Sequence, residues 1–249
     1  MSISIFAGDN LSVLRQLEDE SFDLIYIDPP FNTGRKQQLR GSSFDDRFDD
    51  FIAFIEPRMI EAHRLLKPQG SLFFHIDYRE VHYAKVLLDK IFGRKSFINE
   101  IVWAYDYGAR SKRKWSAKHD NILWYAKDPK NYTFNFEEMD RIPYMAPGLV
   151  GKEKAARGKT PTDVWWHTIV PTNGKERTGY PTQKPLGILN RIIKVHTNPG
   201  DRVLDFFAGS GTTGEAAFRL GRSAVLIDQN EEAISVMRER LAFAKPRFR

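Results

Sequence analysis

The sequence predicts an α/β protein in which helices cover both faces of a mostly parallel sheet. Three observations predict this class. Short apolar runs alternate with amphipathic segments along most of the chain. Several runs are continuously apolar, which is typical of strands buried on both faces of a parallel sheet. The 249 residues, 41% of them hydrophobic, also suffice for the core of one ordinary domain.

The individual elements follow from local patterns. Runs rich in β-branched and aromatic residues predict strands, and apolar residues spaced three and four apart predict helices. Pro57 should break or kink the helix in which it lies. The expected strands are residues 3–6, 22–27, 71–77, 100–105, 121–126, 202–207 and 223–227. The expected helices are residues 11–17, 51–66, 81–92, 186–195, 212–220 and 231–244.

One region departs from this alternation. Residues 128–179 are rich in Pro, Gly, Lys and Arg and have weak periodicity. The stretch is too long for a plain connection between two elements. We therefore expect residues 1–249 to form a single domain, with 128–179 as an inserted recognition unit or a mobile loop.

Composition limits the class of protein and its partners. The net charge of +6 and the pI of about 9.4 favour a polyanionic partner, because Lys and Arg gain affinity by releasing counterions from phosphates. The absence of cysteine excludes disulfides, thiolate metal sites and a cysteine nucleophile. No apolar run approaches a membrane span, and the first residues lack the features of a signal peptide, so we expect a cytoplasmic protein without membrane contact.

The histidines do not predict a metal site. His119 and His167 have no partners at the spacing of metal ligands, and we expect no bound metal. We expect His63 and His75 to have structural roles.

Acidic residues stand at the ends of several expected strands. Asp28, Asp205 and Asp228 each lie where a strand ends, and Asp9 follows the first strand. Open α/β sheets bind ligands at the carboxyl ends of their strands. Each residue alone fits a turn or a helix cap, but four converging on one rim indicate a site.

A glycine-rich loop joins one of these strands to a helix. Residues 208–214 read AGSGTTG, and glycines let the backbone approach a ligand at the helix N-terminus. Residues 209–214 also match G-x-G-x-x-G, with Asp228 about 20 residues on, so an NAD-dependent oxidoreductase is an open alternative. Asp205 counts against it, because its carboxylate would face a pyrophosphate. It could instead pair with the ammonium of S-adenosylmethionine, which carries no phosphate.

The tetrapeptide Asp28-Pro29-Pro30-Phe31 follows a buried strand directly. Two prolines fix φ and remove two N–H donors, which leaves carbonyls in set directions. A carboxylate, rigid carbonyls and an aromatic ring suit a planar amine. A stiff turn is the alternative reading of these four residues taken alone.

Together these segments resemble the amino-methylating DNA methyltransferases. That family carries an Asp/Asn/Ser-Pro-Pro-aromatic catalytic motif, matched by Asp28-Pro29-Pro30-Phe31, and a Phe-x-Gly-x-Gly cofactor motif, matched within residues 205–211. Residues 118–125 and 176–185 match further family segments. The catalytic motif precedes the cofactor motif, which resembles the permuted group called β. The resemblance covers nearly the whole chain and is weakest across residues 128–168. It implies a Rossmann-like methyltransferase sheet.

The resemblance implies roles for these residues. The Asp28 carboxylate and the Pro29 carbonyl would accept hydrogen bonds from the two N–H groups of the target amine, and Pro30 would keep this backbone rigid. Phe31 would stack on a base flipped from the duplex. Asp in the first position favours the N6 amine of adenine, with N4 of cytosine or RNA as alternatives. Asp228 would hold the cofactor ribose and Asp9 its adenine. The expected cofactor-binding residues are Asp9, Thr182, Gln183, Lys184, Asp205, Phe206, Phe207, Ala208, Gly209, Ser210, Gly211, Thr212 and Asp228.

Basic residues predict the contacts to double-stranded DNA. One cluster surrounds an aromatic residue, a pattern that suits phosphate contacts and base stacking. A solvated charged face is the alternative for each cluster, and a non-catalytic DNA-binding relative is a further alternative, against which the intact tetrapeptide argues. A homodimer and a cognate restriction endonuclease stay open as partners. The first cluster is Arg110, Lys112, Arg113, Lys114, Trp115 and Lys118, and the second is Lys152, Lys154, Arg157 and Lys159.

Overall fold

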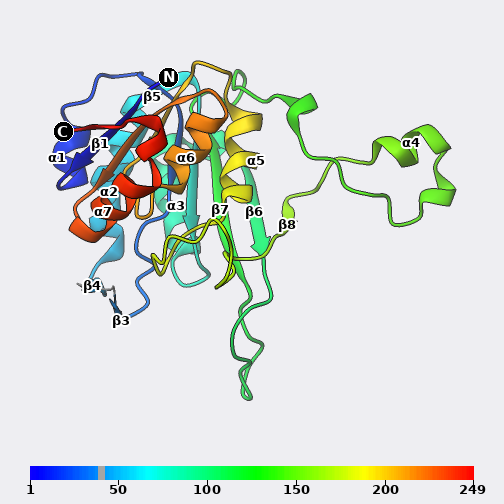
Figure 1. Ribbon diagram of the computed structural model, residues 1–249, viewed down its shortest axis with the longest axis horizontal. Helices are drawn as coiled ribbons and strands as arrows, with labels where there is room; N and C mark the ends of the chain where they lie inside the picture. The colour runs from blue at the N-terminus through cyan, green and yellow to red at the C-terminus, as the bar shows by residue number, and fades with distance from the viewer. Residues whose placement is uncertain (39–42) are drawn as a thin grey trace.

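The computed structural model describes residues 1–38 and 43–249, and its centre is a nine-stranded sheet within that part of the chain (Figure 1). All neighbours from β11 to β5 pair in parallel, whereas β7 is antiparallel to both β5 and β6. The predicted mostly parallel sheet is therefore confirmed. In order across the sheet the strands are β11 (Arg247–Phe248), β1 (Ile3–Ala7), β10 (Ser223–Asp228), β9 (Arg202–Asp205), β2 (Phe22–Ile27), β5 (Leu66–Ile76), β7 (His119–Ala126), β6 (Phe97–Ala104) and β8 (Val164–Trp166).

Helices cover both faces, as the side chains of the central strand β2 demonstrate. Ile25 and Ile27 pack in one core cluster with α1, α2 and α3. Leu24 and Tyr26 point the other way and pack in a second cluster with α5, α6 and α7. Because successive side chains of a strand face opposite sides, this alternation buries β2 completely. The helices are α1 (Asn10–Leu14), α2 (Phe51–Leu65), α3 (Val81–Phe92), α5 (Leu186–His196), α6 (Thr212–Arg219) and α7 (Glu231–Arg240).

Local patterns mispredicted a few elements. Helix α2 continues through Pro57, so the predicted break is wrong. A proline inside a helix costs about 3 kcal/mol, but Ile55 and Met59 beside it are fully buried, and their packing offsets that cost. The last helix ends at Arg240 and is followed by a 3₁₀ turn at Ala242–Ala244. The hairpin of β3 (Arg35–Gln38) and β4 (Ser43–Asp46) was not predicted.

The irregular region divides into an arm and a return segment. Residues 136–163, here called the arm, project sideways from the sheet edge and carry α4 (Lys152–Arg157) (Figure 1). An isolated antiparallel bridge between Ile142 and Lys159 joins the outgoing and returning segments of the arm. The chain then pairs with β6 as β8 and returns through residues 167–185 toward the centre of the sheet.

The topology places one crevice at the middle of the sheet. From β9 the chain passes through α6 to β10 on one side, and from β2 it passes through α2 to β5 on the other. The two connections diverge where β9 and β2 lie side by side, with Leu24 opposite Val203 and Ile25 opposite Leu204. Such a switch point is where open α/β sheets bind ligands. No helix in the described ranges has the length and apolar character that crossing a membrane requires.

Candidate active site

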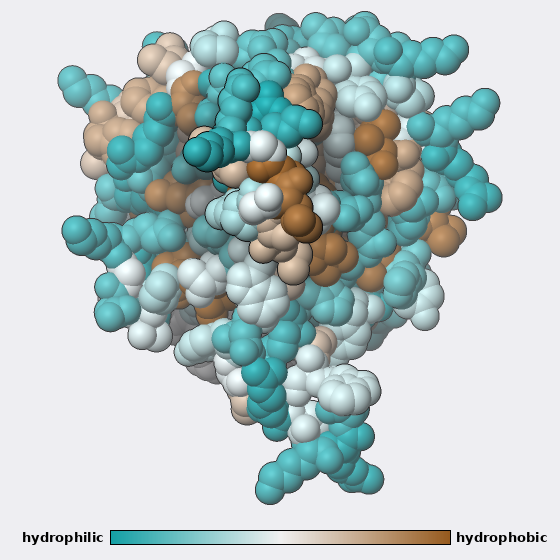
Figure 2. Space-filling model, turned by 90° about the vertical axis from the view of Figure 1, so that its right-hand side faces the viewer, coloured by the Kyte–Doolittle hydropathy of each residue, from teal (hydrophilic) through white to brown (hydrophobic). Residues whose placement is uncertain are grey.

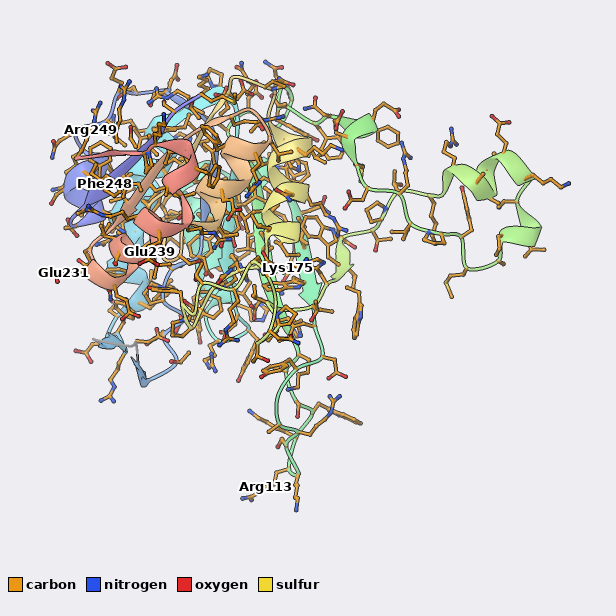
Figure 3. All side chains as sticks on the ribbon, viewed as in Figure 1. Arg113, Lys175, Glu231, Glu239, Phe248 and Arg249 are labelled. Atoms are coloured by element: carbon orange, nitrogen blue, oxygen red, sulfur yellow. The ribbon has the colours of Figure 1, made fainter. Side chains whose placement is uncertain are left out.

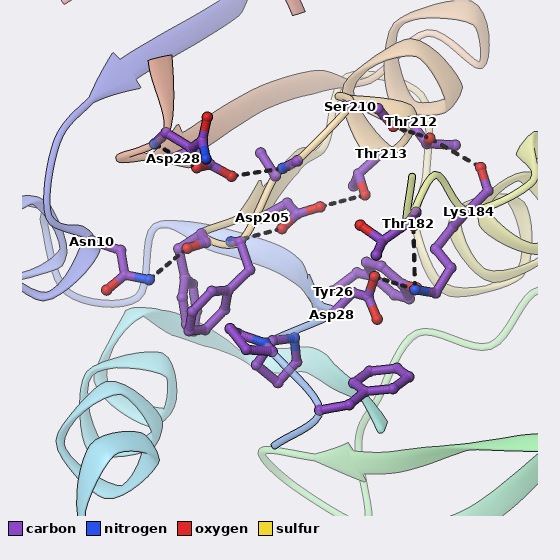
Figure 4. Close-up of a pocket in the computed structure, with 18 of the residues that line it drawn as sticks. Asn10, Tyr26, Asp28, Thr182, Lys184, Asp205, Ser210, Thr212, Thr213 and Asp228 are labelled. Atoms are coloured by element: carbon purple, nitrogen blue, oxygen red, sulfur yellow. Dashed lines mark hydrogen bonds and ion pairs between the residues drawn. The ribbon is translucent and has the colours of Figure 1, made fainter. Parts of the chain in front are cut away.

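A pocket of about 570 Å³ opens at the carboxyl ends of β2, β9 and β10 (Figure 4). The structure brings most of the sequence-predicted site residues to its wall, although they come from segments as far apart in the chain as Asp28 and Asp228. The predicted residues that line it are Asp28, Pro29, Pro30, Phe31, Thr182, Lys184, Asp205, Phe206, Phe207, Ala208, Gly209, Ser210, Thr212 and Asp228.

Asp28 follows the end of β2, and the two oxygens of its carboxylate have different surroundings. Its Oδ2 accepts a hydrogen bond from the ammonium of Lys184, and the two side chains form an ion pair. The same ammonium lies 5.0 Å from the centre of the Phe31 ring. The other oxygen, Oδ1, is buried and makes no hydrogen bond among the described residues. The tetrapeptide therefore already holds an N–H donor between a carboxylate and an aromatic face.

The glycine loop needs its glycines for geometry. Gly209 and Gly211 have φ values of +49° and +76°, in the left-handed region that favours glycine. A Cβ on Gly214 would lie 2.5 Å from Cδ1 of Leu226, so the start of α6 packs directly on β10. The loop thereby makes a tight turn from strand to helix along the pocket wall.

Asp205 is a buried carboxylate whose bonded donors are neutral. Its Oδ1 accepts from the backbone N–H of Phe207 at 3.0 Å and its Oδ2 from the hydroxyl of Thr213 at 2.6 Å. Burial, with smaller contributions from the charges of Asp28 and Asp228, raises the pKa of Asp205 to about 7. A cationic group next to Asp205 would relieve this unfavourable charge, whereas a phosphate would aggravate it.

Asp228 closes the opposite wall of the pocket. Its Oδ2 accepts from the N–H of Gly209 at 2.8 Å and its Oδ1 from the N–H of Asn230 at 2.9 Å. Burial raises the pKa of Asp228 above its usual value, against the lowering effect of these backbone bonds. The bond to Gly209 ties the end of β10 to the glycine loop.

Three predicted cofactor residues do not line the pocket. Asp9 caps α1 by accepting from the N–H of Ser12 at 2.9 Å, and it forms an ion pair with Arg58. Gln183 bonds to Thr178 and Glu176 in the return segment. Gly211 serves the turn of its loop, where a Cβ would collide with Met237 at 2.8 Å.

The pocket wall also contains residues to which the sequence assigned no role. Asn10 lies next to Asp9, donates to the carbonyl of Phe206 at 2.7 Å and accepts from Arg58 at 2.7 Å. Tyr180 lies against Gly209, where its ring would be 3.3 Å from a Cβ. Tyr180 belongs to a segment that resembles the family, which was the available signal, whereas Asn10 had only its position after β1.

The basic loop between β6 and β7 leaves the sheet at the same end as the pocket. Asn121 at the start of β7 pairs with Ile76 at the end of β5, so residues 105–118 leave the sheet at the end where Asp28 lies. Trp115 in this loop is 99% exposed. Arg113 marks its tip in Figure 3, and hydrophilic side chains gather there in Figure 2.

The predicted DNA-contacting cations are not equivalent. Lys118 bonds to the carbonyls of Tyr107 and Ala109, so it stabilises the neck of the loop. Arg110 pairs with Asp106 at 2.6 Å. Lys112, Arg113 and Lys114 are exposed near the tip. No group of three or more His, Asp or Glu side chains in residues 1–38 and 43–249 is arranged to hold a metal ion.

Comparison with known proteins decides the family. The family of N6- and N4-type enzymes described as DNA methylase matches residues 22–239. The chain belongs to this family. It is an amino-methylating DNA methyltransferase that takes the methyl group from S-adenosylmethionine and acts on DNA. The NAD alternative is therefore wrong, in agreement with the position of Asp205 beside the glycine loop.

Similar proteins span nearly the whole chain. It is 34% identical over 242 residues to the type II methyltransferase M.HpaI of Haemophilus parainfluenzae, covering 97% of this chain and 74% of the relative. It is 35% identical over 254 residues to the DNA adenine methyltransferase YhdJ of Escherichia coli, covering 97% and 83%.

Solved structures confirm the Rossmann-like methyltransferase fold. M1.HpyAVI in complex with SAM superposes with a TM-score of 0.67 at 24% identity, covering 96% of this chain and 98% of that one. The cytosine-N4-specific PvuII DNA methyltransferase superposes with a TM-score of 0.73 at 18% identity, covering 96% and 86%.

Proposed function

We propose that this enzyme methylates the N6 amine of adenine at a specific site in double-stranded DNA. The observation that carries the proposal is the ammonium of Lys184, held by the Asp28 carboxylate beside the Phe31 ring. The site thus binds a nitrogen donor in the position that a flipped amine would need. Asp in the first motif position favours adenine, and so does the likeness to the adenine methyltransferase YhdJ.

The pocket fits the cofactor by chemistry and by size. Its volume of about 570 Å³ is that of a pocket for a small-molecule ligand. Asp205 offers a buried carboxylate for the cofactor ammonium, residues 209–212 would hold the methionine part, and Asp228 would bind the ribose hydroxyls. The cofactor supplies an electrophilic methyl group on a positively charged sulfur.

The residues around Asp28 would prepare the amine. The nitrogen lone pair of adenine is delocalised into the ring. Lys184 yields Oδ2 of Asp28 to one amine N–H, and the carbonyl of Pro29 accepts the other, which favours a pyramidal nitrogen. Positive charge then grows on that nitrogen during transfer, so the fixed carboxylate stabilises the transition state more than the ground state. Phe31 stacks on the base and compensates for its lost stacking in the duplex.

We also propose how the outer regions serve this reaction. The arm would contribute to target recognition, and the exposed cations of residues 112–114 would contact phosphates near the pocket rim. The order of motifs along the chain supports the permuted β group. The likeness to type II methyltransferases supports a role in restriction–modification with a cognate endonuclease.

Incubation with methyl-labelled cofactor tests the chemistry. The substrates are unmethylated double-stranded DNA, the same sequence as RNA, and DNA already methylated at adenine N6, each followed by nucleoside analysis. We expect label in N6-methyladenine from unmethylated DNA alone. Label in N4-methylcytosine, in RNA only, or in no nucleoside would overturn the proposal.

A further inference from the structure

The catalytic carboxylate is backed by a buried histidine. His75 lies on β5 and is fully buried. Its Nδ1 is 3.6 Å from Oδ1 of Asp28, the oxygen without a hydrogen bond. On the other side of the ring, Nε2 is 3.2 Å from Oδ2 of Asp120 on β7. The imidazole thus lies between two carboxylates, one of which lines the pocket.

The partners of His75 define its tautomer. The pKa of Asp120 is below its usual value, because the bond and charge of His75 and the charge of Lys184 outweigh the effect of burial. Asp120 is therefore a carboxylate and can only accept, so Nε2 of His75 carries a hydrogen. Burial and the surrounding carboxylates raise the pKa of Tyr26 far above its usual value, so its hydroxyl donates to Nδ1 at 2.7 Å. The lone pair of Nδ1 therefore accepts the Tyr26 hydroxyl, and Nδ1 can act as a base toward Asp28 once that hydroxyl turns away.

We propose that His75, oriented by Asp120, receives the proton that the methylated amine releases through Asp28. This inference rests on the proposed methyl transfer and adds the group that the proton reaches. An Asp–His pair with its second ring nitrogen toward a reacting group is an arrangement that proteins use repeatedly for proton transfer. The sequence predicted only a structural role for His75.

Every bond in the step is accounted for. After transfer the amine nitrogen carries a positive charge, and one of its N–H bonds breaks as Asp28 takes the proton. The Tyr26 hydroxyl turns away from Nδ1, while the carboxyl group turns about χ2, a soft two-fold torsion, and approaches Nδ1 to hydrogen-bond length, about 2.9 Å. An N–H bond then forms on Nδ1, and Asp28 returns to a carboxylate. The proton leaves to water after the product departs.

The surroundings of His75 suit a transient positive charge. Asp28 and Asp120 provide two negative charges, and the Tyr26 hydroxyl can turn to accept from the new N–H. Other neighbours are the rings of Phe31 and Trp103, at 5.7 and 5.5 Å between centroids, and the nearby cation Lys184 is paired with Asp28. Tyr105 donates to the far oxygen of Asp120 at 2.9 Å, so the hydrogen bonds continue from β2 through β5 and β7 to the residue that follows β6.

His75→Asn is the main test, because Asn keeps a polar group near Nδ1 but does not titrate. Single-turnover methylation is measured between about pH 5.5 and 9. We expect the wild-type rate to fall at the acid end, because a base must be unprotonated to accept the proton. The variant should be about 100-fold slower, and its pH–rate profile should lose the decline at acid pH, here called the acid limb. Cofactor binding and melting temperature should stay near wild type. A purely structural role would lower the rate equally at every pH.

Two variants keep the inference falsifiable if His75→Asn fails to fold. Asp120→Asn removes a negative charge beside His75, so the acid limb should move to lower pH. Tyr105→Phe removes a donor to Asp120, which makes that carboxylate a stronger partner of the imidazolium, so the limb should move to higher pH. An unchanged limb in both variants would overturn the inference. Absence of methylation by the wild type would instead contradict the proposed function.

Discussion

The carboxylates at the pocket rim and the cations on the β6–β7 loop differ in how the protein holds them. Asp28, Asp205 and Asp228 are all held by contacts within the protein. Lys112 and Arg113 lie exposed on a loop whose neck is fixed by Lys118. Chemistry that is the same at every turnover benefits from prearranged groups. Contacts to a long polyanion need only charge within reach, and they tolerate variation.

Asp28→Ala should have the largest effect on methylation among the changes at the pocket rim. Removing the carboxylate should lower the methylation rate by at least about 1,000-fold, because positive charge on the amine loses its only fixed counter-charge in the proposed mechanism. Cofactor affinity should stay within a few-fold, since Asp205 and Asp228 are untouched. Rapid-quench methylation and calorimetry measure the two quantities. Near-normal turnover would contradict the mechanism.

Asp205→Asn separates cofactor binding from chemistry within the same rim. We expect affinity for S-adenosylmethionine to fall by about 30-fold, the loss of one charge-assisted hydrogen bond. The wild-type affinity should also weaken as pH falls through about 7, because the raised pKa of Asp205 means that its carboxylate becomes protonated there. The Asn variant should lose this dependence. Calorimetric titrations from pH 6 to about 8.5 check it, and parallel curves for both proteins would rule the assignment out.

A triple variant in which Lys112, Arg113 and Lys114 are each replaced by Ala tests the β6–β7 loop. We expect KM for DNA to rise about tenfold and the slope of log affinity against log salt to become shallower by about 2 to 3 units. The value of kcat at saturating DNA should change less than about twofold, since the pocket is intact. A second triple variant replaces Lys152, Lys154 and Arg157 on α4, and a similar rise in KM there would show that the arm also contacts DNA. A loss confined to kcat would place the loop in the chemistry instead.

The smallest effect is expected at Asp9. Asp9→Ala removes the cap of α1, which should cost about 1 kcal/mol of stability, but cofactor affinity should change less than about threefold because Asp9 does not line the pocket. Asn10→Ala is the paired variant and should weaken the cofactor more. Thermal melts and cofactor titrations compare the two. The opposite order would restore the role that the family resemblance implied for Asp9.

Local sequence patterns located the rim well because its residues stand at strand ends. Asp28, Asp205 and Asp228 each end a continuous apolar run, and parallel strands bring such ends together whatever their distance in the chain. The glycine loop followed from the same reasoning, since a strand that enters a helix through glycines leaves N–H groups free.

Contacts between side chains on different strands could not be predicted from local sequence patterns. The approach of His75 to Asp120 depends on the antiparallel register in which Ile76 faces Asn121, and no short pattern encodes that pairing. Strand β8 has three residues, too few for a period to show. Lys184 was expected among the cofactor-binding residues by family resemblance, whereas its ammonium lies on Asp28, 156 residues away along the chain.

The contact between Lys184 and Asp28 has a consequence for how the target enters. A bare carboxylate in a pocket of this depth would have to shed water each time a base arrived. In the proposed mechanism the ammonium of Lys184 takes the place of water on Oδ2, so the incoming amine exchanges one nitrogen donor for another on the same oxygen. The rate of base capture would then depend on how readily the lysine side chain swings aside.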